Sequence, residues 1–459
     1  MRTLLWYNNI YYFAWLSNKF FKKYVENTVF NGYFIYFLKN FVFCIAFLAK
    51  KVYYVKRHIV KGESKMVLSK KALQVSASPT LAIDAKFKAM KAEGIDVIGF
   101  GCGEPDFDTP DNIKEMAIKA IRDGQTKYTP ASGTVDLKKA ICEKLKKDNG
   151  LDYTPANIVV SNGAKHSLMN AFDAIINPGD EIIVPAPYWV SYTEMIKMAD
   201  GVPVIIETRE EDGFKFTVQQ LKDAITPKTK ALVLNSPSNP TGMLYGDDEL
   251  KAIAEVAVES DIFVIADEIY EKLIYDGKKH ISIASFNDEI KDRTIIVNGV
   301  SKSYAMTGWR IGFTAANAEV TKVMSNMQSH AASNPSSISQ AAALEAYVGE
   351  QGTVEEMRKV FEERRNYMVD RINSIKGVSC KKPEGAFYVM MNIKDLFGKE
   401  FGGRVINTSD DFCEVLLEKS LVALVPGSGF GAEGYVRWSY ATSMENIEKG
   451  LDRLEEFLA

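Results

Sequence analysis

Short apolar runs alternate with segments of helical periodicity between Leu151 and Ala315. The runs are rich in β-branched residues and cover residues 158–160, 181–184, 204–206, 231–234, 262–266 and 294–297. Continuous apolar strands separated by helices predict a mostly parallel sheet with helices on both faces. We therefore expect an α/β fold in this part of the chain.

The pattern changes beyond about residue 345. The elements expected there are a long charged helix and two strands, at residues 353–374, 385–390 and 435–439. A helix followed by separate strands predicts a second, smaller α+β domain. We expect residues 66–112 and 346–459 to form this small domain and residues 113–345 to form the large one.

The first 65 residues differ in composition from the rest. They hold 11 Lys and Arg against 2 Asp and Glu, a charge of +9, so the remainder carries −12 of the total −3. Residues 29–49 are apolar enough to suggest a membrane span, but Lys39 within them costs roughly 2.5–3.5 kcal/mol. The segment is an anchor, a disordered or loosely helical extension, or upstream sequence translated in error before a natural start at Met66. We favour the last and expect no catalytic chemistry from it.

Composition excludes several classes of function. A formal charge of −3 argues against a nucleic-acid-binding protein. The cysteines show no C-x-x-C spacing, which indicates reduced thiols and a cytoplasmic location; they are Cys44, Cys102, Cys142, Cys380 and Cys413. The four histidines lack metal-ligand spacing, so we expect no metal.

Polar motifs follow the predicted strands. They lie at residues 161–163, 235–237, 267–268 and 301–302. The carboxyl ends of strands in an open α/β sheet meet at one edge, where ligands bind. We therefore expect these polar groups to converge on a cofactor.

Lys302 and Arg310 suggest the cofactor. Lys302 follows an apolar strand in a loop of small residues, as suits a Schiff-base nucleophile, and Arg310 between two glycines suits a phosphate. Together they indicate an aldehyde cofactor that carries a phosphate, as in pyridoxal phosphate. The alternative is a surface lysine and a structural arginine.

Asp267, at the end of a buried strand, could pair with a protonated pyridine nitrogen, or could instead cap a helix. Tyr270 and Asn239 could hold the ring oxygen, although Asn239 lies in what could be a plain Pro/Gly turn.

Three further groups could contact the same ligand. Residues 161–165 join a strand to a helix and could bind phosphate through backbone N–H groups. Trp189 could stack on an aromatic ring, or belong to the core. Arg437 could clamp a substrate carboxylate, or form a structural salt bridge.

Five motifs in this order resemble the class I aminotransferases of the aspartate aminotransferase kind, which are fold-type I pyridoxal-phosphate enzymes. The resemblance covers about residues 67–458, and its motifs are Gly103–Pro110, Lys127–Pro130, Asn239–Gly242, Asp267–Tyr270 and Ser301–Arg310. It implies a large cofactor-binding domain, a smaller α+β domain, pyridoxal 5'-phosphate as cofactor, and a homodimer with shared active sites.

The resemblance also implies a role for each matched residue. Lys302 forms the Schiff base and later moves the proton, Asp267 pairs with the pyridine nitrogen, and Trp189 stacks on the ring. Asn239 and Tyr270 are expected to hold the ring oxygen. Ala164, Lys165 and Arg310 are expected at the phosphate, with Tyr128 from the neighbouring subunit, and Ser301 also binds the cofactor. The substrate is expected to contact Gly103, Trp189, Asn239 and Arg437, with its α-carboxylate at Gly103, Asn239 and Arg437.

One departure from the family concerns the distal carboxylate of the substrate. The aspartate enzymes of animals and enteric bacteria bind it with an arginine, and the matching stretch here, residues 329–337, has none. The chain resembles a bacterial subgroup with a different distal site, some members of which also use prephenate. Lys165 and Thr80 are our candidates for that site.

The sequence thus predicts transfer of an amino group between L-aspartate and 2-oxoglutarate. Alternatives are an aminotransferase with prephenate/glutamate, aromatic or alanine-like substrates, and a pyridoxal-phosphate C–S lyase. A regulator with an aminotransferase-like sensor domain would need a basic helix-turn-helix module, which residues 1–65 do not resemble. A third alternative is a membrane-attached scaffold, and the apolar residues 29–49 are the one feature of the sequence that suggests it.

Overall fold

The computed structural model describes residues 68–76, 79–101 and 103–459. Contacts divide the chain into two units, residues 1–68 and 69–459, and the fold below is that of the second. The predictions for residues 1–65, including a membrane span at 29–49, lie outside the described residues. Within the part that is described, no helix is both long and apolar enough to cross a membrane.

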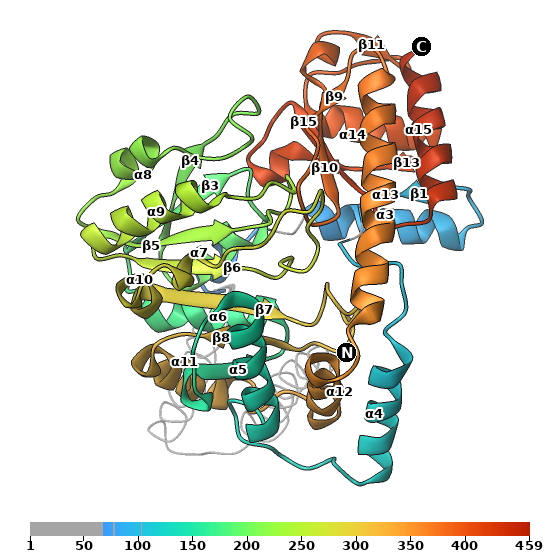
Figure 1. The fold of residues 1–459 in the computed structure, drawn as a ribbon. Helices are drawn as coiled ribbons and strands as arrows, with labels where there is room; N and C mark the ends of the chain where they lie inside the picture. Colours follow the sequence, from blue (N-terminus) through green and yellow to red (C-terminus); the bar gives the residue numbers. More distant parts are fainter. Residues whose placement is uncertain (1–67, 77–78, 102) are drawn as a thin grey trace, which may run out of the picture. The chain divides into compact units, whose positions relative to one another are not determined.

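A seven-stranded sheet forms the centre of the fold, with the strand order β2-β8-β7-β6-β5-β3-β4 (Figure 1). Its strands are β2 (Ile158–Ser161), β3 (Glu181–Ala186), β4 (Val202–Glu207), β5 (Thr229–Asn235), β6 (Phe263–Asp267), β7 (Thr294–Gly299) and β8 (Gly312–Ala315). β3 to β7 pair in parallel. The expected mostly parallel sheet is confirmed.

β8 departs from the predicted pattern, because it runs antiparallel to both β7 and β2. Its four residues are all buried. The sequence did not single it out, since a run of four residues with Gly312 in it gives a weak strand signal.

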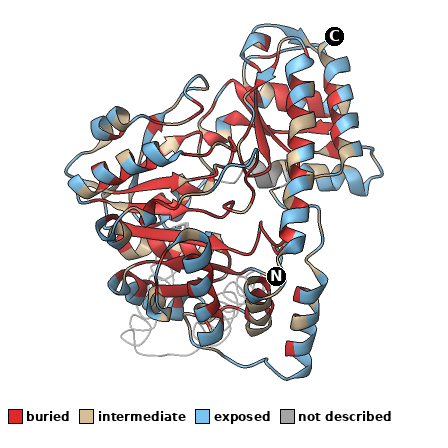
Figure 2. Cartoon of the chain, viewed as in Figure 1, coloured by how far each residue is buried: buried red, intermediate tan, exposed pale blue. Residues whose placement is uncertain are grey.

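Helices cover both faces of this sheet, and successive strand residues pack on opposite sides. Ile265 belongs to the apolar cluster formed with α6, α7 and α11, whereas Val264 and Ala266 pack with α8, α9 and α10. The helices around the sheet are α4 (Asp111–Arg122), α5 (Val135–Asn149), α6 (Ala164–Ile175), α7 (Ser191–Met198), α8 (Val218–Ala224), α9 (Asp247–Glu259), α10 (Asp288–Arg293), α11 (Ala318–Ala331) and α12 (Ser337–Val348). Buried residues therefore concentrate in the strands (Figure 2).

A second group of elements is built on a four-stranded sheet of order β14-β15-β10-β9 and a short parallel pair, β1-β13. Its strands are β1 (Ile98–Gly99), β9 (Ser379–Cys380), β10 (Tyr388–Asn392), β11 (Glu400–Phe401), β12 (Arg404–Val405), β13 (Val422–Ala423), β14 (Val425–Pro426) and β15 (Tyr435–Ser439). Its helices are α3 (Pro79–Ala92), α13 (Gly352–Ser374), α14 (Ser409–Ser420) and α15 (Met444–Leu458).

The long helix expected at 353–374 is present as α13. The strand expected at 385–390 begins later, at Tyr388, because Ala386 has φ of +58° and cannot continue an extended strand. β1 pairs with β13, which agrees with residues 66–112 joining the C-terminal part. The domain boundaries themselves stay a prediction.

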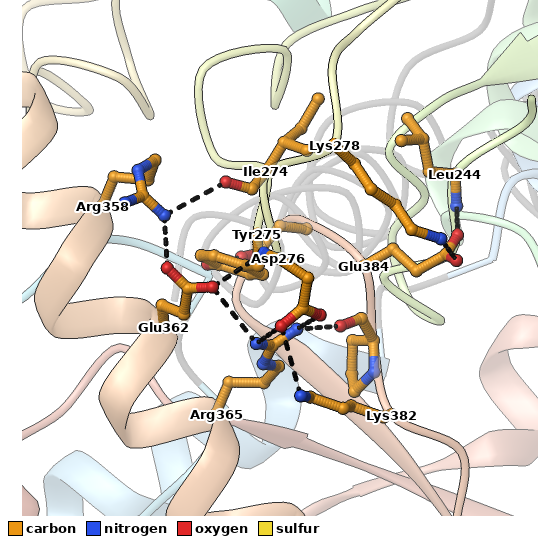
Figure 3. A network of polar contacts seen from close by, with 12 residues as sticks. Leu244, Ile274, Tyr275, Asp276, Lys278, Arg358, Glu362, Arg365, Lys382 and Glu384 are labelled. Atoms are coloured by element: carbon orange, nitrogen blue, oxygen red, sulfur yellow. Dashed lines mark hydrogen bonds and ion pairs between the residues drawn. The ribbon is translucent and has the colours of Figure 1, made fainter.

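A polar network ties the segment after β6 to α13 (Figure 3). The fully buried Arg365 donates to both Asp276 oxygens at 2.7 and 2.9 Å and to the Pro383 carbonyl at 2.8 Å. Glu362 accepts from the Asp276 amide at 2.7 Å and from Arg358 at 2.6 Å. This network fixes the chain a few residues beyond Asp267 and Tyr270.

Candidate active site

A cavity of about 430 Å³ lies at the carboxyl edge of the central sheet. It is lined by Gly101, Gly103, Glu104, Ala164, Lys165, Leu168, Trp189, Tyr192, Asn235, Asn239, Asp267, Ile269, Tyr270, Ser301, Lys302, Thr307, Arg310, Tyr388 and Arg437. Of the strand-end motifs, residues 235, 267, 301 and 302 are in this set and residues 161–163, 236–237 and 268 are not. Among the residues that were given a role in the site, and apart from Thr80, whose side chain is not described, the one outside the set is Tyr128, which is 91% exposed.

Lys302 follows β7, and its ammonium donates to the Gly103 carbonyl. It lies 6.0 Å from the centre of the Tyr270 ring. The loop that carries it is braced by Thr109, whose hydroxyl donates to the Ala305 carbonyl at 2.7 Å and accepts from Trp309 at 2.9 Å. Lys302 is thereby held in a partly enclosed position at the strand end, as a nucleophile requires.

Asp267 is the last residue of β6 and is only 4% exposed. Its carboxylate accepts from the Tyr192 hydroxyl at 2.7 Å and from the Ile269 amide at 3.2 Å. Burial raises the pKa of Asp267 to about 6 despite these bonds. The residues after it form turns, so the helix-capping alternative is wrong.

Asn235 and Tyr388 organise the groups next to Asp267. Asn235 donates to the Asp267 carbonyl at 2.9 Å and accepts from the Asn239 amide at 2.8 Å. The hydroxyls of Tyr270 and Tyr388 lie 3.0 Å apart. Asn239 and Tyr270 are therefore both held at the cavity wall, as expected for residues that approach one ligand oxygen.

The N-terminus of α6 forms a cationic end of the cavity. The first backbone N–H groups of a helix lack intrahelical acceptors and favour anions; α6 begins at Ala164. Gly163 has φ of +87°, and a Cβ there would lie 2.2 Å from the Arg310 guanidinium. A Cβ on Gly312 would lie 2.2 Å from the Ala164 amide nitrogen. Both glycines are required for Arg310 and β8 to lie against this turn.

Lys165 adds a second cation beside Arg310. Burial, and to a smaller extent Arg310, lower the pKa of Lys165. Its ammonium lies 4.8 Å from the centre of the Trp189 ring, which makes an edge contact with Tyr192 at 5.4 Å. The other candidate for the distal site, Thr80, has a side chain outside the described part of the structure.

Arg437, on β15, is 2% exposed although it belongs to the C-terminal sheet. It donates to the Asn239 side-chain oxygen at 2.9 Å and to the Gly101 carbonyl at 2.9 Å, and its guanidinium lies 4.4 Å from the centre of the Tyr388 ring. A charged group fixed this way can bind a carboxylate with little loss of side-chain entropy.

Sequence reasoning missed Tyr192, Tyr388 and the role of Asn235. Asn235 is the last residue of β5, and its place at a strand end could have indicated it. Tyr192 lies three residues after Trp189, and that local spacing could have indicated it as well. Tyr388 pairs with a residue 118 positions away, and no local pattern indicates that contact.

The set fits a ligand with distinct ends: a buried carboxylate for a cationic ring nitrogen, a lysine amine for an aldehyde, and a helix N-terminus with two cations for a phosphate. These are the features of pyridoxal phosphate. The residues present thus fit the group that the sequence predicted.

Comparison with known proteins identifies the family. The model of the class I and II aminotransferases matches residues 95–454. An aspartate aminotransferase from Bacillus sp. (strain YM-2) is 51% identical over 394 residues, covering 86% of this chain and 100% of the relative. A probable aspartate/prephenate aminotransferase from Aquifex aeolicus is 47% identical, covering 85% of this chain and 98% of the relative.

A Thermus thermophilus aspartate aminotransferase solved with maleate superposes with a TM-score of 0.81 at 42% identity, covering 85% of this chain and 100% of that one. The likeness confirms the fold-type I architecture expected from the motifs. The chain therefore belongs to the class I and II aminotransferases and is similar, within them, to the aspartate aminotransferases.

Proposed function

We propose that this aminotransferase uses pyridoxal 5'-phosphate to move an amino group between L-aspartate and 2-oxoglutarate. The observation that carries the proposal is the convergence of Lys302, Asp267 and Arg437 on one cavity. An amine, a buried carboxylate and a buried guanidinium are there brought together from separate parts of the chain. The names of the similar proteins support the choice of aspartate.

The cofactor would supply an aldehyde for the amino group and a ring that accepts electrons from the substrate Cα. Lys302 would hold the aldehyde at rest and move the α-proton once its amine is free. Asp267, ionised, would keep the ring nitrogen protonated. Tyr270 and Asn239 would hold the ring oxygen, and Trp189 would stack on the ring.

The phosphate would lie against the N-terminus of α6. Ala164, Ser301 and Arg310 would contact it, because a helix N-terminus and a guanidinium both favour an anion. The substrate α-carboxylate would bind Arg437, with Asn239 and Gly103 beside it.

The distal carboxylate of aspartate needs its own cation. Residues 329–337 supply no arginine, whereas Lys165 lines the cavity. We assign the distal carboxylate to Lys165. Prephenate belongs among the substrates to test, since similar proteins carry it in their names.

A homodimer with shared sites is part of this proposal. Tyr128 does not line the cavity of its own chain and is 91% exposed, which supports its contribution to the site of a second copy. Sedimentation of the purified protein should give twice the mass of one chain, and a monomer with full activity would contradict the shared site.

Borohydride trapping tests the cofactor assignment. Reduction of the purified yellow protein should attach the cofactor to Lys302, as peptide mass spectrometry would show, and Lys302→Ala should abolish both the label and transamination. Lys322→Ala, an exposed lysine on α11, should retain both. Label on a different lysine would overturn the assignment.

A panel of amino donors with 2-oxoglutarate tests the reaction. Aspartate should give the highest kcat/KM, with oxaloacetate and glutamate formed in equal amounts. Release of ammonia and a keto acid without any amino acceptor would instead indicate a lyase.

We also propose that residues 1–65 are dispensable. Their charge and composition differ from those of the rest, and the family match begins at residue 95. A chain that begins at Met66 should be dimeric and fully active. Loss of folding or activity in that chain would show that the segment is part of the enzyme.

A further inference from the structure

A buried cluster of charged groups lies behind the turn that carries Asp267 and Tyr270. Its members are Lys144 on α5, Glu268 and Glu271 in the turn, and His280 in the loop that follows. Lys144, Glu268 and Glu271 are 8%, 3% and 8% exposed, and the His280 side chain is 7% exposed. Charged groups so deeply buried require partners.

Two pairs make up the cluster. Lys144 forms an ion pair with Glu271, and Asn149 donates to the same carboxylate at 3.0 Å. His280 Nε2 lies 3.2 Å from Glu268 Oε2, although the angle is not that of a regular hydrogen bond. The ligand atoms of Glu268, Glu271 and His280 all lie within 4.8 Å of one another, so the pairs act on each other.

The charges in the cluster indicate what His280 does there. Two carboxylates face one ammonium in the interior, and at the rim Asp148 is matched by Lys272 at 2.7 Å. Burial raises the pKa of Glu271, but the charges of Lys144 and His280 outweigh it and hold the value at about 2. The two carboxylates therefore outnumber the one ammonium, and His280 is the remaining interior group that could balance them. Tyr153, whose buried hydroxyl has no partner in the described structure, faces Glu268 and adds no charge at neutral pH.

The cluster connects directly to the active site. The Glu268 amide donates to the Val297 carbonyl at 2.9 Å and so continues the β6–β7 ladder past Asp267. The Glu271 amide donates to the Glu268 carbonyl at 3.0 Å, which closes the turn that carries Tyr270. The negative charge of Glu268 also acts on Asp267 and raises its pKa.

We propose that His280 is a positioning residue of the transamination site: it pairs with Glu268, holds the turn, and neutralises the carboxylate next to Asp267 so that Asp267 stays ionised. The inference rests on the role of Asp267 in the proposed function. It assigns no metal to the cluster, because Lys144 already neutralises Glu271.

The test follows cofactor binding by the apoprotein as a function of pH. His280→Gln removes the positive charge and leaves Glu268 to act on Asp267, so a higher pH is needed to ionise Asp267. The pH of half-maximal binding should rise by about one unit, which corresponds to a tenfold change in the ionisation equilibrium of Asp267. Glu268→Gln should lower it.

The double variant His280→Gln/Glu268→Gln should return close to the wild-type midpoint, because the carboxylate that His280 neutralises is then absent. A purely structural role predicts that both single variants weaken binding at every pH without moving the midpoint in opposite directions, and that result would overturn the proposal. His330→Gln, at an exposed histidine on α11, is the matched control and should not shift the midpoint.

The remaining outcomes are also decisive. If His280→Gln does not fold, Glu268→Gln alone carries the test, and an unchanged midpoint overturns the proposal. A midpoint that moves on treatment with EDTA would make the cluster a metal site and overturn it as well. Absence of cofactor binding by the wild-type protein would instead refute the proposed function.

Discussion

The two ends of the cavity hold opposite charges in different environments. Asp267 and Tyr192, at one end, are 4% and 2% exposed, whereas Lys165 and Arg310, at the other, line the cavity but are much more accessible to solvent. Charges interact strongly where water is excluded and are screened where it is present. Changes at the acidic end should therefore affect catalysis most, and changes at the cationic end should affect the choice and affinity of the ligand.

Asp267→Asn tests the acidic end most directly. The amide keeps the size of the side chain but cannot keep a ring nitrogen protonated, so kcat should fall by ~10²-fold or more. Cofactor absorbance should remain when the cofactor is supplied in excess, because the phosphate contacts are untouched, although the affinity for the cofactor should fall with the loss of the ionised carboxylate. Steady-state kinetics and a visible spectrum measure the two effects.

The control for this change is Asp261→Asn, at an 87% exposed side chain just before β6, which should behave as the wild type. Near-normal turnover of Asp267→Asn would remove the electron-sink role that we give Asp267 and would make the acidic end no more sensitive than the rim.

Lys165→Ala tests the cationic end. If Lys165 binds the distal carboxylate, KM for aspartate and 2-oxoglutarate should rise about tenfold, equivalent to about 1.4 kcal/mol. Alanine and aromatic donors lack that carboxylate and should be affected much less. Kinetics with both classes of donor measure the difference.

Equal losses for acidic and neutral donors would make Lys165 a phosphate contact, and the distal site would then lie elsewhere. The two classes of donor are internal controls for one another, since any damage to cofactor binding reduces both.

The cationic end and the strand-end residues could be predicted from sequence because both follow from local rules. Apolar runs predicted the parallel strands, and the carboxyl ends of those strands bring Asn239, Asp267 and Lys302 to one edge. β8 was not predicted, because it is only four residues long and contains Gly312, and its antiparallel pairing does not follow the pattern of the other strands.

The missed contacts are those that join distant positions. Tyr192 reaches Asp267 across 75 residues, and Tyr388 reaches Tyr270 across 118. Which tyrosine pairs with which partner depends on how α7 and β10 pack, and hydrophobic periodicity does not encode that. The arrangement at Tyr128 depends on a second copy of the chain.

Tyr192→Phe tests how much one hydrogen bond contributes to the acidic end of the cavity, and we expect a smaller effect from it than from the changes at Asp267 and Lys165. Burial raises the pKa of Asp267 to about 6, and the Tyr192 hydroxyl opposes this rise. Loss of the hydroxyl should raise the pKa further, by about one unit for a charge-assisted bond of about 1.5 kcal/mol. Because Asp267 acts in its ionised form, the apoprotein should bind the cofactor less well at low pH. The pH of half-maximal binding should therefore rise, with little change in binding well above that pH. Two results would contradict this prediction: an equal loss of cofactor affinity at high and low pH, or an unchanged midpoint. Either would show that Tyr192 supports Trp189 by packing alone and that burial, not this hydrogen bond, determines the pKa of Asp267.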